Sequence, residues 1–179
     1  MKTYNFMTYV PQRYDLAKFK QTAHLGYVRN FIYSFKDGKK WATDQAAELV
    51  SQALLRWYGD NCKNFVIACV PACSERENRK RFRHFVAVVS KVCGMKSTNG
   101  HIRVLGERDA LHRTANHMVR EEAYNIYIDK EFFCGKTVIL FDDLITTGTT
   151  ANLFADLLTQ AGATVKGGLF LARTMFNQK

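Results

Sequence analysis

The sequence predicts an α/β fold in which an open, mostly parallel sheet carries helices on both faces. Two continuous apolar runs, NFVIACV at 64–70 and KTVILF at 136–141, have the length and β-branched content of buried strands. An amphipathic segment follows the second run at 150–163, and another strand-like run comes next at 164–173. Strand, helix and strand in this order form a unit whose strands run parallel, and such sheets bury both faces under helices.

The rest of the chain supplies further elements. Residues 43–60 have apolar side chains at helical spacing, with Thr43 as the expected N-cap. Residues 74–94 are expected to form a basic loop that runs into a helix ended by a glycine. A short strand with a turn is expected at 102–109, and a loop with one or two helical turns at 112–133. The residues before these elements are expected only as a small N-terminal segment.

Length and composition indicate one globular domain over residues 1–179, with 47% hydrophobic and 23% charged residues. Lysine and arginine outnumber aspartate and glutamate by 26 to 16, so the net charge of +10 favours an anionic partner. Nucleic acid, a membrane surface and a polyphosphate substrate all fit that charge.

The five cysteines contain no CxxC pair, which excludes a zinc ribbon and favours reduced, free thiols. No run approaches the ~20 apolar residues of a membrane span, and the N-terminus lacks the apolar core of a signal peptide. The expectation is a cytoplasmic protein with no membrane partner.

The stretch VILFDDLITTGTTA, residues 138–151, carries the clearest functional signal. Asp142 and Asp143 follow a buried strand, at the end where ligands bind in open α/β sheets. The loop after them contains Thr146, Thr147, Gly148, Thr149 and Thr150 and leads into a helix. Hydroxyls, a tight glycine turn and a helix N-terminus suit a phosphate, whereas the carboxylates suit ribose hydroxyls or Mg²⁺. A phosphorylated ribose would suit both the hydroxyl-rich loop and the carboxylates. The other common phosphate-binding patterns, the Walker loop GxxxxGK[ST] and the dinucleotide fingerprint GxGxxG, are absent from the sequence.

This stretch resembles the phosphoribosyl pyrophosphate (PRPP) motif of type I phosphoribosyltransferases, and the wider chain is similar to their ComF-like, amidophosphoribosyltransferase-like branch. The resemblance implies a Rossmann-like topology with an N-terminal hood. It implies that Asp142 and Asp143 hold the ribose hydroxyls as catalytic residues and that residues 146–150 hold the 5-phosphate. Thr146 stands where 6-oxopurine enzymes carry a third aspartate, which argues against a hypoxanthine–guanine enzyme.

Further substrate contacts follow from the same resemblance. The loop after NFVIACV, with Ala72, Cys73 and Ser74, matches the position of the pyrophosphate-binding loop. Arginine suits bidentate phosphate contacts, so Arg76 and Arg79 are candidates for the pyrophosphate. Residues 106–117 resemble a lid, from which Arg108 and Arg113 are expected to reach the pyrophosphate.

The expected function is therefore phosphoribosyl transfer from PRPP to an unidentified nitrogen acceptor, with release of pyrophosphate. Mg²⁺ is the expected cofactor. It is expected to bind mainly through PRPP, with Asp142 and Asp143 as the only candidate protein ligands. A homodimer is compatible with the resemblance. The alternative is a non-catalytic, ComF-like protein that binds nucleotide or nucleic acid and is linked to DNA uptake. The basic run at 76–83 suits either pyrophosphate or nucleic acid, or it is a solvated helix face.

Overall fold

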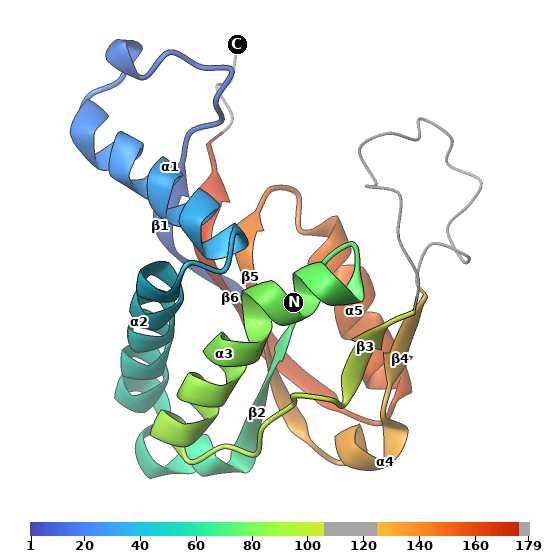
Figure 1. The fold of residues 1–179 in the computed structure, drawn as a ribbon. Coiled ribbons are helices and arrows are strands. Elements are labelled where there is room, and N and C mark those ends of the chain that lie inside the picture. The colour runs from blue at the N-terminus through green and yellow to red at the C-terminus, as the bar shows by residue number, and fades with distance from the viewer. Residues whose placement is uncertain (106–124, 176–179) are drawn as a thin grey trace.

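A computed structural model describes residues 1–105 and 125–175 and has a four-stranded sheet at its centre (Figure 1). The strand order is β1-β6-β5-β2, and every neighbouring pair is parallel. The strands are β1 (Thr3–Tyr9), β2 (Phe65–Cys69), β5 (Thr137–Ile145) and β6 (Thr164–Thr174). The expected α/β fold with an open parallel sheet is confirmed.

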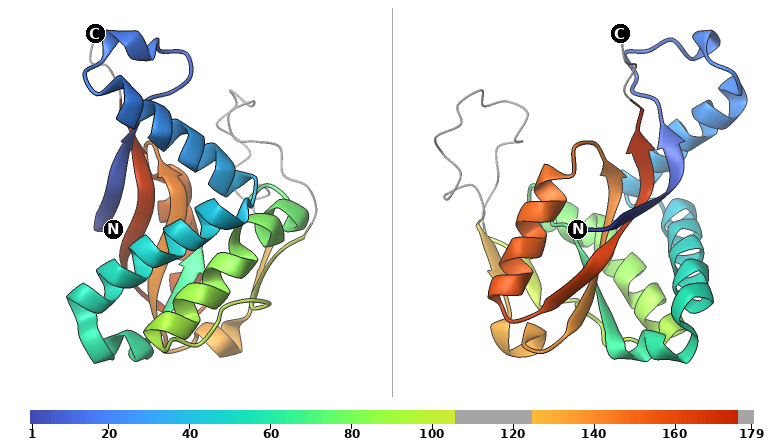
Figure 2. Two further views of the ribbon diagram at one scale, coloured as in Figure 1. Left: turned by 60° about the vertical axis from the view of Figure 1, so that its left-hand side comes forward. Right: turned by 180° about the vertical axis from the view of Figure 1, so that it is seen from behind.

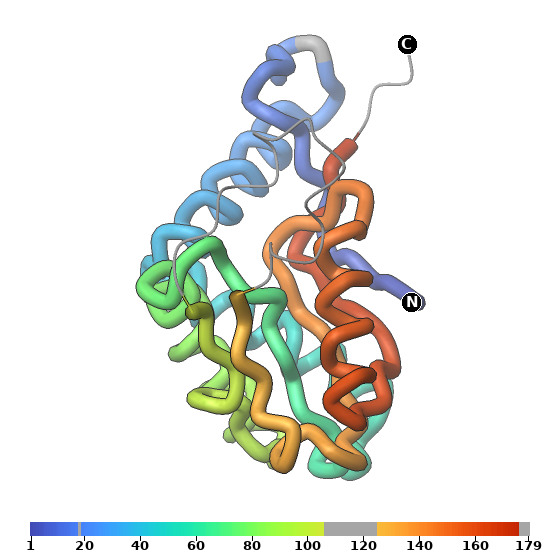
Figure 3. Tube along the Cα trace, turned by 90° about the vertical axis from the view of Figure 1, so that its right-hand side faces the viewer, coloured from blue at the N-terminus to red at the C-terminus, as the bar shows by residue number. Residues whose placement is uncertain are grey.

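Helices cover both faces of this sheet (Figure 2). One face carries α1 (Thr22–Lys36), α2 (Lys40–Tyr58) and α3 (Glu75–Cys93), and the opposite face carries α5 (Thr149–Gln160). On the α5 side of the main sheet lie a separate two-stranded antiparallel sheet and a short helix (Figure 3). These are β3 (Ile102–Val104), β4 (Ile126–Ile128) and α4 (Lys130–Phe133), while 3-10 turns occupy η1 (Leu16–Lys18) and η2 (Gly59–Asn64).

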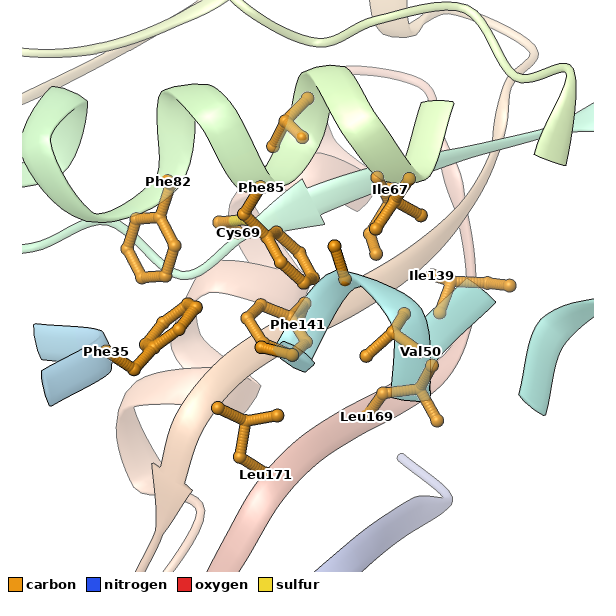
Figure 4. Close-up of a cluster of buried hydrophobic side chains, with 14 of the residues drawn as sticks. Phe35, Val50, Ile67, Cys69, Phe82, Phe85, Ile139, Phe141, Leu169 and Leu171 are labelled. Atoms are coloured by element: carbon orange, nitrogen blue, oxygen red, sulfur yellow. The ribbon is translucent and has the colours of Figure 1, made fainter. Parts of the chain in front are cut away.

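Strand β5 is buried on both sides, which explains its unbroken apolar run. Its side chains alternate between two cores because successive residues of a strand point to opposite faces. Val138 and Leu140 pack in the core on the α5 face, whereas Ile139 and Phe141 pack under α1–α3. Figure 4 shows the ring of Phe141 among Phe35, Phe82 and Phe85. Its ring stacks on Phe85 with the centroids 4.0 Å apart.

The N-terminal segment contributes more to the fold than the sequence indicated. Residues 3–9 form an edge strand of the main sheet, in register with β6 from Thr3 opposite Gly168 to Tyr9 opposite Thr174. The amide of Met175 donates to the carbonyl of Tyr9 at 2.8 Å, so the ends of both strands remain joined. Helix α1 then packs its apolar side chains against the sheet.

Three boundaries differ from the expected ones. Helix α2 begins at Lys40, so Thr43 is not its N-cap but a buried residue whose hydroxyl donates to the carbonyl of Lys39. Helix α3 begins immediately after Ser74, so the basic run is helical and not a loop. Strand β5 continues through both aspartates to Ile145. The helices within the described ranges are each too short or too polar to cross a bilayer.

The packing of Phe141 gives a stability prediction. Phe141→Ala removes a fully buried ring between the sheet and three helix phenylalanines, so it should lower the free energy of unfolding by about 3–5 kcal/mol. Urea unfolding followed by circular dichroism measures the change. The control is Val92→Ala on exposed α3 surface, which should change it by less than about 0.5 kcal/mol. A loss below about 1 kcal/mol for Phe141→Ala would show that this core relaxes around the cavity.

Candidate functional site

The candidate site lies where β2 and β5 end side by side. Strand β5 leads through residues 146–148 into α5, and β2 leads through residues 70–74 into α3. The amide of Val70 donates to the carbonyl of Phe141 at 2.9 Å, so the second loop starts beside the aspartates. The structure thus brings together the acidic pair, the threonine loop and the loop expected to bind pyrophosphate.

Asp143 is buried in an ion-paired network with two helices. Its side chain accepts a hydrogen bond from Nη1 of Arg81 on α3 at 3.0 Å and lies 3.5 Å from Nζ of Lys36 on α1. Only 4% of the carboxylate side chain is exposed. Both of its oxygens therefore have a cationic partner before any ligand binds.

Asp142 is in a different position. Alternation along β5 places it on the same face as Leu140, toward α5, because neighbouring strand residues point to opposite sides. It is half-buried, and its Oδ1 accepts a hydrogen bond from the amide of Asp143 at 2.8 Å. Burial first, and the adjacent charge of Asp143 second, raise the pKa of Asp142 to about 8. A carboxyl group with that pKa gains from a partner that stabilises its ionised form.

The threonine loop forms the turn into α5. Gly148 stands at the N-cap with φ of 83°, a left-handed conformation that other residues rarely adopt, and it gives the helix no side-chain cap. The hydroxyls of Thr147 and Thr149 are 3.0 Å apart, and the amide of Thr149 points to the hydroxyl of Thr147 at 3.4 Å. Thr147 and Thr149 are exposed, so their hydroxyls line an open helix N-terminus that suits an anion.

The remaining threonines of the loop differ in exposure and partner. Thr146 is exposed, and its hydroxyl lies 3.1 Å from the hydroxyl of Thr174 at the end of β6. Thr150 is half-buried in the first turn of α5. The contact of Thr146 fixes the loop to the neighbouring strand, which leaves Thr147 and Thr149 as the hydroxyls best placed for a ligand.

The loop after β2 is fixed largely by its own hydrogen bonds. The hydroxyl of Ser74 accepts from the amide of Glu77 and caps α3, so it is committed to the helix. The amide of Ala72 donates to Oδ1 of Asn78 at 3.2 Å. Cys73 is exposed at the tip. A ligand at this loop would therefore meet its backbone and the surrounding cations more than the Ser74 side chain.

The expected arginines are only partly gathered at the site. Arg76 and Arg79 are exposed on the first turns of α3, and Arg79 forms a 2.6 Å ion pair with Glu75. Arg108 and Arg113 lie outside the described residues, as does the whole segment 106–117 that was expected to be a lid.

Two residues outside the motif are central to the geometry. Arg81 belonged to the basic run without being assigned to the site, and Lys36 lay in a segment given no helix. Arg81 lies four residues before the buried Phe85, and Lys36 lies four after the buried Ile32. Because residues four apart share a helix face, this spacing was the available signal that both cations face inward.

The donor set bears on the expected Mg²⁺. Within residues 1–105 and 125–175, no group of three or more histidine, cysteine, aspartate or glutamate side chains could hold a metal ion. Asp142 offers one carboxylate, the oxygen type that Mg²⁺ prefers. These residues fit a Mg²⁺ ion that takes most of its ligands from a bound phosphate compound and from water. Asp142 would be at most one protein ligand.

Comparison with known proteins adds no further constraint. No protein-family model matches the chain, and no curated protein is significantly similar to it. Functional assignment therefore depends on the motif and on the geometry described above.

The raised pKa of Asp142 predicts how its replacement changes stability with pH. The pKa of Asp142 is about 8 in the folded protein, against an ordinary value of 3.8. Between those values the unfolded chain loses this proton while the folded protein keeps it, so the free energy of unfolding of the wild type falls as the pH rises. Asp142→Asn should therefore stabilise the fold relative to the wild type, by a margin that grows by at most about 1.4 kcal/mol per pH unit. Thermal unfolding at pH 5, 6, 7 and 8 measures that margin. A margin that is constant or shrinks with pH would contradict the assignment.

The ion pairs of Asp143 predict a second stability effect. Arg81→Met leaves a buried carboxylate with only Lys36 beside it, so the free energy of unfolding should fall by about 3 kcal/mol. Arg83→Met on the same helix is the matched control, because Arg83 is exposed, and should change it by less than about 0.5 kcal/mol. Equal effects of the two substitutions in urea unfolding would mean that Arg81 does not stabilise Asp143.

Proposed function

We propose that the protein is a phosphoribosyltransferase that binds PRPP together with Mg²⁺ and transfers the phosphoribosyl group to a nitrogen acceptor. One observation carries the proposal. Asp142 is the member of the acidic pair that forms no ion pair within the described residues, and it precedes the open threonine loop at the end of β5. An acceptor for hydroxyls and a cradle for phosphate thus occur in the order that a 5-phosphorylated ribose requires.

The proposed pose follows from these positions. The 5-phosphate takes the α5 N-terminus, where Thr147, Thr149 and the first-turn amides donate to it. The ribose hydroxyls donate to Asp142. The pyrophosphate then faces the loop at 71–74, because Val70 is hydrogen-bonded to the residue before Asp142. Among the exposed arginines of α3, Arg76 is the one closest in sequence to that loop.

The proposed reaction requires the protein to position the two reactants and to stabilise the charge of the transition state. It requires no covalent enzyme intermediate. A nitrogen lone pair forms the new bond to C1 of the ribose, and the bond from C1 to the pyrophosphate oxygen breaks with its electron pair leaving on that oxygen. The transition state carries positive charge on the sugar. Hydrogen bonds from the ribose hydroxyls favour the ionised form of Asp142, which then stabilises that positive charge through the ribose. Bound Mg²⁺ supplies charge neutralisation for the leaving pyrophosphate.

Calorimetric titration with PRPP tests the proposal. Wild-type protein should bind PRPP with micromolar affinity only when Mg²⁺ is present. Asp142→Asn should weaken binding by roughly tenfold or more, because a hydrogen bond to a charged group contributes about 1.5–3 kcal/mol. The matched control is Asp156→Asn, an exposed aspartate on α5, and it should bind like the wild type. No binding by the wild type, or equal binding by both variants, would overturn the proposal.

The alternative of nucleic-acid binding without transfer has its own support. Arg76 and Arg83 are exposed on α3 and lie seven residues apart, about two turns along one side of the helix. Binding through backbone phosphates weakens steeply with salt, whereas a ligand enclosed among the loops of the sheet loses less. DNA binding that falls steeply with salt and is unchanged by Asp142→Asn, with no PRPP binding, would select this alternative.

A further inference from the structure

A groove lies at the edge of the sheet, where β1 begins beside the first half of β6. It has a volume of about 630 Å³, within the range of small-molecule sites. Its floor is apolar and is formed by Leu54, Ile139 and Leu169, which are almost completely buried. The candidate PRPP site is at the carboxyl ends of β2 and β5, whereas this groove lies at the outer edge of the sheet, beside the amino end of β1.

Aromatic side chains form the walls of this groove. Tyr4 and Trp57 are 47% and 42% exposed, although each is large and apolar. Their rings meet edge to face with centroids 4.9 Å apart, and Tyr58 continues the wall beside Trp57. Each ring supports the other through this contact, and part of each ring is exposed and can contact a planar ligand.

Lys166 is placed over the groove by an irregularity in the sheet. Val138 on β5 lies opposite Val165, but the next residue, Ile139, lies opposite Gly167, so Lys166 has no partner on β5. The pairing of β1 with β6 begins only at Gly168. Bulges of this kind redirect a side chain and recur next to functional sites.

The redirected ammonium group lies against aromatic rings. Nζ of Lys166 is 5.4 Å from the ring centroid of Tyr58 and 5.5 Å from that of Phe65. Lys2 is the second lysine of the groove, and among the described residues that line it there is no aspartate or glutamate. The groove therefore combines exposed ring faces with uncompensated positive charge, and such a pair of features suits a flat aromatic ligand that carries an anionic group.

We propose that this groove is a second ligand site that takes a single free nucleotide, with the base against Trp57 and Tyr4 and the phosphate at Lys166 and Lys2. A single nucleotide is the occupant that these observations favour, because the cavity has small-molecule size. A nucleic-acid strand would need positive charge extended along its path, whereas the groove has two lysines at one place. The proposal does not depend on the phosphoribosyltransferase assignment.

Tryptophan fluorescence tests the proposal directly. The chain has two tryptophans, so a Trp41→Phe background leaves Trp57 as the only reporter. AMP is the probe, and adenosine, inorganic phosphate and a single-stranded oligonucleotide are titrated in parallel. AMP should quench Trp57 to saturation, adenosine should bind roughly tenfold more weakly, and inorganic phosphate should leave the signal unchanged.

Variants locate the bound nucleotide. Lys166→Met keeps the apolar stem and removes the charge, and it should weaken AMP binding by roughly tenfold. Lys130→Met, which removes an exposed lysine on α4, should have no effect. Asp142→Asn should also leave the Trp57 signal unchanged, which separates this groove from the candidate PRPP site. Circular dichroism confirms that each variant is folded.

Four results would overturn the proposal. These are absence of saturable quenching by AMP, equal affinity of Lys166→Met and the background protein, equal affinity for AMP and adenosine, and quenching by the oligonucleotide alone. Loss of the AMP signal in Asp142→Asn would likewise assign the nucleotide to the other site. Failure of PRPP to bind elsewhere on the protein has no bearing on any of these outcomes.

Discussion

The carboxylate of Asp143 is held between Arg81 of α3 and Lys36 of α1, and the geometry of the candidate site depends on this contact. It joins a strand near the C-terminus to two helices from the first half of the chain. Because a buried charge without partners is strongly unfavourable, the three elements have little freedom to slide past one another at this end of the sheet. The aromatic cluster around Phe141 directly beneath gives the same elements an apolar contact.

Fixing Asp143 has an electrostatic consequence for Asp142. The neighbouring residue is half-buried beside a fixed negative charge, and its pKa rises for both reasons. A carboxyl group in such a position lowers the stability of the empty protein. A ligand that donates hydrogen bonds to it, or brings a cation, restores that stability. The two adjacent aspartates, which look equivalent in the sequence, therefore have different proposed roles. Asp142 is proposed to bind the ligand, and Asp143 to hold β5 in place against α1 and α3.

Much of the fold could be predicted from short-range patterns. The apolar runs at 64–70 and 136–141 and the helix after them were correctly placed because a strand buried on both faces leaves an unbroken hydrophobic signal. Strand β1 was missed because TYNFMTY mixes polar and aromatic residues, as suits an edge strand whose seven residues are exposed or half-buried except for the last. Its place in the sheet depends on pairing with β6, some 160 residues away, as the register of Thr3 with Gly168 shows.

The loops of the candidate site could likewise be predicted from the sequence, but the contacts between them and the helices could not. The order of aspartates, threonines and glycine indicated the loop after β5, and the family resemblance indicated the loop after β2. The structure brings these two loops together. The partners of Asp143 could not be identified from that motif, since they come from two other helices and only the folded chain brings them within 4 Å. The bulge at Lys166 is likewise a property of strand register, for which the sequence VKGG carries no separate signal.

A crystal structure with PRPP and Mg²⁺ bound tests the account most directly. In that structure the 5-phosphate should lie at residues 146–150 and the ribose hydroxyls should donate to Asp142, while Asp143 should remain paired with Arg81 and Lys36. Density for PRPP elsewhere on the protein, or an Asp143 side chain that leaves Arg81 to take the ribose, would contradict the division of roles between the two aspartates.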